Sequence, residues 1–147
     1  MLPKRAGGIE LKIMVMDGQG GGVGRSLVEY LHERYPEAEL VAVGTNATAT
    51  SNMMKGGTVL GATGENAVVY NSSRVDAIVG PMGIVMANAM MGEVTPRMAE
   101  AVASGDVPVL LIPMSRCNAQ VMGVANKKLG EYVREVGERL AGLAGMG

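Results

Sequence analysis

The sequence feature that most constrains this chain is a cluster of glycines between an apolar run and a helical pattern. The apolar run covers residues 11–16, and five of the seven residues from 18 to 24 are glycine. Apolar side chains then recur at helical spacing until Pro36. Glycine loses more conformational freedom on folding than any other residue, so such a cluster is typical of a loop that something approaches closely. A buried strand, a glycine-rich loop and a helix are predicted in that order.

The same alternation of strands and helices continues along the chain. Further strands are predicted over 39–44, 75–80, 107–113 and, for a short one, 120–124. Helices are predicted over 46–57, 61–73, 96–105 and from 129 onward, with Thr63 as the N-cap of the second of these. The pattern favours a Rossmann-like, doubly wound α/β domain over 11–147, with a mainly parallel sheet of four or five strands and helices on both faces. Residues 1–10 are expected to form a flexible N-terminal extension.

Small, polar or glycine residues follow each of the four main predicted strands. In open α/β sheets the ligand crevice lies beyond the carboxyl ends of the strands, where the strand order reverses. These four loops are therefore expected to form one ligand site. Its predicted residues are Asp17, Gly18, Gln19, Gly20, Gly21, Gly22, Val23, Gly24, Thr45, Asn46, Thr63, Gly64, Glu65, Asn66, Gly80, Pro81, Arg116 and Asn118.

The glycine loop suits phosphate, because its N–H groups can approach an anion at the positive end of the next helix. The spacing of Gly18, Gly22 and Gly24 resembles the nucleotide loop of the short-chain dehydrogenases, which keeps NAD and NADP open as cofactors. However, no Asp or Glu follows the strand over 39–44 to bind a ribose hydroxyl, and that family's Tyr-x-x-x-Lys pair is missing. A P-loop is disfavoured, since Arg25 replaces the phosphate lysine. The remaining alternative is a tight turn without a ligand.

Two residues are candidates for catalysis. Asp17 follows the first strand and could contact a ligand, or it could simply fix the turn. Cys117 follows the fourth strand beside Arg116, which would lower the pKa of a thiol and could bind an anion, although a lone cysteine is often an inert buried residue. We expect Arg116→Ala to weaken ligand binding by roughly 1.5–3 kcal/mol and Cys117→Ser to change binding little. No metal site is predicted.

The composition indicates which partners the protein can bind and in which compartment it is expected. A net charge of −1 and the absence of Phe and Trp argue against nucleic-acid binding. No apolar run approaches the roughly 20 residues of a membrane helix, and one cysteine allows no intrachain disulfide, so we expect a cytoplasmic protein without membrane contact. Residues 84–91 are rich in Met and Ala and uncharged, which predicts a homo-oligomer, with a dimer expected, through this region or the neighbouring helix.

Several segments together resemble a known family. The stretches DGQGGGVG, GTNATATSNM, GATGENA and RCN, with the Met-rich segment between the last two, are similar to a family of short bacterial proteins known as domain of unknown function 3842. The resemblance implies a small Rossmann-like domain and brings no assigned reaction. The leading hypothesis is therefore a protein that binds a nucleotide or another phosphorylated small molecule. The alternatives are a small oxidoreductase or group-transfer enzyme using Cys117 or Asp17, and a non-catalytic oligomeric interaction subunit.

Overall fold

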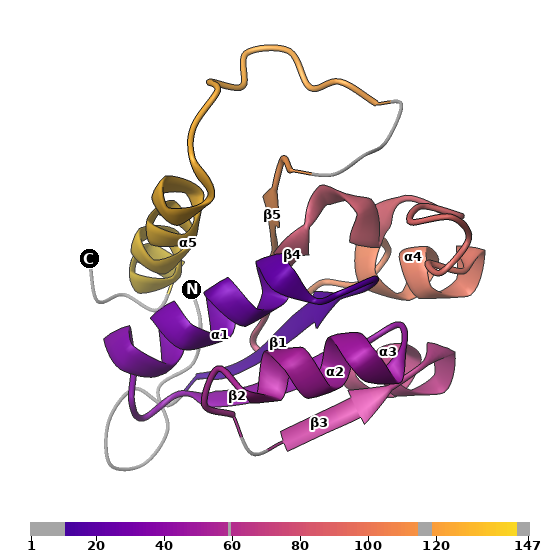
Figure 1. The fold of residues 1–147 in the computed structure, drawn as a ribbon, viewed down its shortest axis with the longest axis horizontal. Helices are drawn as coiled ribbons and strands as arrows, with labels where there is room; N and C mark the ends of the chain where they lie inside the picture. Colours follow the sequence, from indigo (N-terminus) through magenta and orange to yellow (C-terminus); the bar gives the residue numbers. More distant parts are fainter. Residues whose placement is uncertain (1–10, 59, 115–118, 144–147) are drawn as a thin grey trace.

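The structure is a computed structural model that describes residues 11–58, 60–114 and 119–143. Strands and α-helices alternate along it, joined after the fourth strand by a 3₁₀ turn, η1 (Figure 1). The strands are β1 Lys12–Asp17, β2 Glu39–Gly44, β3 Leu60–Thr63, β4 Ala77–Pro81 and β5 Val109–Ile112. The helical segments are α1 Gly22–Arg34, α2 Ala47–Met54, α3 Glu65–Ser72, η1 Met82–Val85, α4 Pro96–Ala103 and α5 Leu129–Leu143.

The strands of the described residues form one parallel sheet in the order β3-β2-β1-β4-β5. In its centre, Val15 of β1 pairs with Ala42 of β2 on one side and with Val79 of β4 on the other. The chain winds outward from β1 to β3 and then returns to place β4 on the opposite side of β1. The strand order therefore reverses between β1 and β4, which is where ligands bind in sheets of this kind.

Helices cover both faces of the sheet, because successive side chains of a strand point to opposite faces. Ile13 and Val15 of β1 belong to a core that contains side chains of α1, α2 and α5. Met14 and Met16 belong to a second core, which contains side chains of α3 and α4. Each of these four strand residues is fully buried. The predicted Rossmann-like, doubly wound α/β fold is confirmed.

Two local predictions are wrong. Thr63 does not cap a helix: it is the last residue of β3, and α3 begins two residues later after Gly64. β3 lies at the edge of the sheet with largely exposed side chains, so it shows no apolar run in the sequence. The short strand expected over 120–124 is not formed either, and its residues are exposed.

The part of the chain that the structure describes contains no helix long and apolar enough to cross a lipid bilayer.

Candidate functional site

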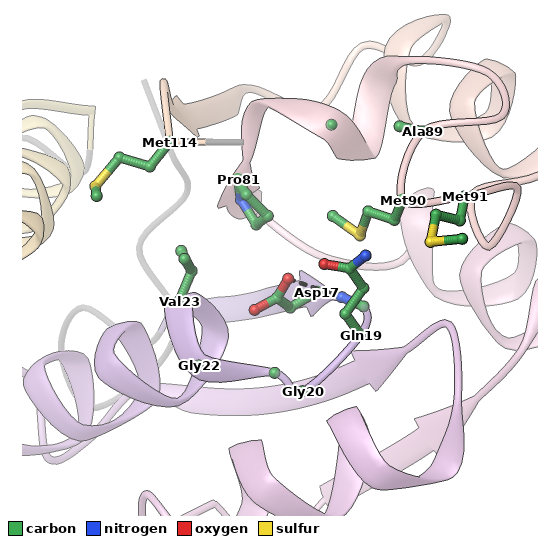
Figure 2. A pocket seen from close by; sticks show the side chains of 13 residues that line it. Asp17, Gln19, Gly20, Gly22, Val23, Pro81, Ala89, Met90, Met91 and Met114 are labelled. Atoms are coloured by element: carbon green, nitrogen blue, oxygen red, sulfur yellow. Dashed lines mark hydrogen bonds between the residues drawn. The ribbon is translucent and has the colours of Figure 1, made fainter. Parts of the chain in front are cut away.

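A cavity of about 330 Å³ lies at the carboxyl ends of β1 and β4, at the point where the strand order reverses. The glycine loop forms one side of it, and η1 with the chain that follows forms the other (Figure 2). The lining residues are Asp17, Gly18, Gln19, Gly20, Gly21, Gly22, Val23, Pro81, Gly83, Ala89, Met90, Met91 and Met114. Eight of these are among the residues predicted from the sequence.

Asp17 holds the glycine loop in shape through hydrogen bonds to its backbone. Its carboxylate accepts the N–H of Gly18 and the N–H of Gly24, both at 2.7 Å, and the residue is only 4% exposed. Burial raises the pKa of the Asp17 carboxyl, although the two hydrogen bonds act in the opposite direction. Of the two roles considered for Asp17, this geometry favours fixing the turn.

Three of the five loop glycines are required by the fold. A side chain on Gly18 would collide with Thr45, since its Cβ would lie 2.5 Å from Oγ1. Gly21 has a φ of 73°, a conformation that favours glycine, and a Cβ there would lie 2.7 Å from the carbonyl oxygen of Ala49. Gly24 lies in the first turn of α1, where a Cβ would come within 2.4 Å of the Met53 sulfur. Close packing therefore explains these glycines without any ligand.

Gly20 and Gly22 are different. A Cβ added to either would have no atom within 4 Å among the described residues, and neither has a left-handed φ. Their backbone N–H groups also have no acceptor in the described part of the chain. Both residues line the cavity, and Gly22 is the first residue of α1. The fold thus leaves two N–H groups without an acceptor among the described residues, at and just before the positive end of a 13-residue helix.

Glu93 is a member of this region that the sequence analysis missed. One carboxylate oxygen, Oε1, accepts three hydrogen bonds: from the Gln19 N–H at 2.8 Å, the Thr45 hydroxyl at 2.7 Å and the Asn46 amide at 2.8 Å. Partial burial acts to raise the pKa of Glu93, but these three hydrogen bonds outweigh it and the pKa is lowered. Glu93 is therefore ionised at neutral pH, beside the glycine loop and the end of β2.

Thr45 and Asn46 were predicted to contact a ligand, and in the structure they bind this carboxylate. Asn46 is also the N-cap of α2, because its side chain accepts the Ala49 N–H at 2.8 Å. Neither residue lines the cavity. Glu93 reaches them from a tight turn between η1 and α4, in which Asn88, Met90, Met91 and Gly92 all have positive φ. No local sequence pattern of the kinds used above signals such a turn.

The remaining predicted residues fall into separate places. Thr63 shares a hydrogen bond with Thr50 at 2.8 Å, and Glu65 accepts one from Thr95 at 2.7 Å; both lie at the β3 side of the sheet edge, away from the cavity. Gly64 and Asn66 adjoin them and do not line it either. Gly80 is buried in β4, and a Cβ there would lie 2.3 Å from the Met16 carbonyl oxygen, so close packing explains this glycine. The structure thus brings together the glycine loop and Pro81, but not the loop after β3.

Arg116, Cys117 and Asn118 lie outside the described residues, so the predictions made for them stay predictions. Met114, two residues before Arg116, does line the cavity, as Figure 2 shows. Within the described ranges, no three His, Cys, Asp or Glu residues are grouped so that they could hold a metal ion.

A parallel sheet of this strand order, with a cavity beside the loop that joins β1 to α1, defines a Rossmann-like α/β protein. More particularly, the chain belongs to the family described as domain of unknown function (DUF3842), whose model matches residues 12–144. No curated protein matches the chain. A solved structure that resembles it is a dodecameric FMN-dependent Ubix-like decarboxylase from Escherichia coli O157:H7, at 18% identity and a TM-score of 0.44, covering 90% of this chain and 76% of that one.

Proposed function

We propose that this protein binds a nucleotide or another phosphorylated small molecule, with the phosphate on the glycine loop. The observation that carries this proposal is the pair Gly20 and Gly22. These are the loop glycines that packing does not require, both line the cavity, and their N–H groups have no acceptor among the described residues. A phosphate that accepts these N–H groups at the start of α1 would need both positions to lack a side chain.

The cavity supports a ligand with a polar part and an apolar part. Its floor is the glycine loop, while Val23 and Met114 lie toward one side and Met90 and Met91 toward the other (Figure 2). Its volume of about 330 Å³ lies at the lower end of the range for small-molecule sites. Methionine side chains are flexible and polarisable, so they suit the flat face of a base or a similar apolar group.

Catalysis has weaker support than binding. Asp17 is nearly fully buried, and both of its oxygens accept loop N–H groups, which supports a positioning role rather than proton transfer to a ligand. A redox or group-transfer reaction at Cys117 stays a prediction from the sequence. NAD and NADP remain candidate ligands within the proposed class.

A thermal unfolding screen tests the proposed binding. The purified protein is heated with nucleoside mono- and diphosphates, NAD, NADP, sugar phosphates and inorganic phosphate. A compound at one hundred times its Kd stabilises the folded state by about 2.7 kcal/mol, which corresponds to roughly 5–10 °C in Tm for a chain of this size. We expect at least one phosphorylated compound to reach such a shift and its unphosphorylated counterpart to fall short. No shift with any of them would reject the proposal.

We further propose a homo-oligomer in the cytoplasm, with a dimer as the expected state. The support for assembly is exposed apolar surface. Met91 is 96% exposed at the end of the predicted segment 84–91, although Ile84 at its start is fully buried in the core. Exposed apolar side chains also occur at Val121 and Met122, in the segment before α5 that extends away from the sheet and helices (Figure 1).

A further inference from the structure

Glu93 supplies a carboxylate at the end of β2, where the residues that follow the strand in the sequence are not acidic. In dinucleotide-binding Rossmann folds, an acidic residue at the end of the second strand accepts the hydroxyls of a ribose. Here β2 ends in Gly44 and is followed by Thr45 and Asn46, neither of which is acidic. Glu93 comes from a turn 48 residues further along the chain and places its Oε1 atom 2.7 Å from the Thr45 hydroxyl.

The hydrogen bonds of Glu93 leave one oxygen available. Oε1 accepts the three donors of Gln19, Thr45 and Asn46, which fix the orientation of the carboxylate. Oε2 accepts no hydrogen bond from any described residue. A fixed, ionised carboxylate with one oxygen that accepts no hydrogen bond from the described residues is an acceptor for hydroxyl groups, and hydrogen bonds to charged groups are among the stronger ones.

Glu93 also lies next to the proposed phosphate site. The residue that donates to it, Gln19, is followed directly by Gly20, and both line the cavity. Glu93 itself does not line the cavity, so only a ligand that extends from Gly20 and Gly22 toward β2 would reach this negative charge. A neutral hydroxyl-bearing group fits there, whereas a second phosphate would be repelled by the carboxylate.

We infer that Glu93 is a ribose-binding residue that selects nucleotides with a free 2′,3′-diol over 2′-deoxy and 2′-phosphorylated ones. This inference rests on the proposed function and narrows it. It favours NAD over NADP among dinucleotides, and ribonucleotides over deoxyribonucleotides.

Isothermal titration with matched nucleotides tests the inference. For the wild type we expect ADP to bind at least about tenfold more tightly than 2′-deoxy-ADP, and NAD more tightly than NADP. Glu93→Gln keeps an acceptor for Thr45 and Asn46 but removes the charge. In this variant, the affinities for ADP and 2′-deoxy-ADP should differ by no more than about threefold, and so should the affinities for NAD and NADP. The control is Glu37→Gln, which removes the same charge at an exposed position in the turn before β2 and leaves both ratios unchanged.

The outcomes separate this inference from the proposed function. Equal wild-type affinity for ADP and 2′-deoxy-ADP, or tighter binding of NADP than of NAD, overturns the role of Glu93 and leaves phosphate binding intact. Unchanged ratios in a folded Glu93→Gln protein also overturn it. Binding of none of these nucleotides by the wild type overturns the inference, and the proposed function is rejected with it only if sugar phosphates and inorganic phosphate also fail in the thermal screen. The wild-type comparison needs no variant, so the inference stays testable even if Glu93→Gln fails to fold.

Discussion

Gly22 and Gly24 lie two residues apart, but substitutions at these positions have different expected effects. A side chain at Gly22 points into open space, so Gly22→Val should leave the free energy of unfolding within about 1 kcal/mol of wild type and abolish ligand binding by blocking the loop N–H groups. Gly24→Val is the matched comparison. It forces a side chain against Met53 and Asp17 and should destabilise the fold by about 1–3 kcal/mol.

Urea unfolding and titration calorimetry on the two variants check this prediction. A Gly22→Val protein that binds the ligand identified in the thermal screen as tightly as wild type would remove the glycine loop from the site. A Gly24→Val protein as stable as wild type would contradict the packing explanation for that glycine.

The ionisation of Glu93 predicts a pH dependence of stability. Its pKa is lowered from an ordinary value of 4.5, so the carboxylate stabilises the folded state above that pH, and this contribution is lost as the pH falls through the lowered pKa. The pKa of Asp17 is raised instead, so the ionisation of Asp17 lowers the free energy of unfolding as the pH rises through this raised pKa. Comparison with a Glu93→Gln variant removes the contribution of the Glu93 carboxylate, and it also removes a negative charge that helps to raise the pKa of Asp17.

We therefore expect the difference in unfolding free energy between wild type and Glu93→Gln to favour wild type at pH 7. The difference should shrink as the pH is lowered below 4.5. Urea titrations across this range measure it. A difference that stays constant with pH would show that the charge of Glu93 does not stabilise the turn.

At the scale of elements, the start of α4 depends on one hydroxyl. Thr95 Oγ1 accepts the Met98 N–H at 3.1 Å and donates to Glu65 at 2.7 Å, so it caps α4 and joins it to the start of α3. Thr95→Ala should cost about 1 kcal/mol and lower Tm by roughly 2–4 °C. Thr95→Ser keeps the hydroxyl and should lose clearly less, as differential scanning calorimetry can show. Equal losses in both variants would assign the effect to the methyl group instead.

At the scale of the whole molecule, the exposed apolar side chains predict association. Light scattering at micromolar concentration should give at least the mass of a dimer, and a monomer mass would refute the proposed assembly. Met91→Lys should shift the mass toward monomer if the predicted segment 84–91 forms the contact, because a charge buried in an apolar interface is costly. Met122→Lys tests the segment before α5 in the same way.

Elements with local signals can be predicted from the amino-acid sequence. The buried strand β1, the glycine loop and α1 follow from adjacent residues, and so does the start of α4 at Pro96. The position of a site at the carboxyl ends of the strands follows from the alternation of strands and helices, since parallel strands end at one edge. These features could be predicted because each depends on periodicity or on residues within a few positions.

The tertiary structure alone decided what depends on contacts between distant segments. β3 forms at the edge because β2 offers it hydrogen bonds, and its own residues carry no strand pattern. Contacts with Thr45, Ala49 and Met53, which all lie beyond the loop in the sequence, determine which loop positions have no room for a side chain. Glu93 reaches Gln19 across 74 positions, through a turn of left-handed residues that no local rule predicts. The sequence therefore determines where a ligand site can form, and the long-range packing determines which groups face it.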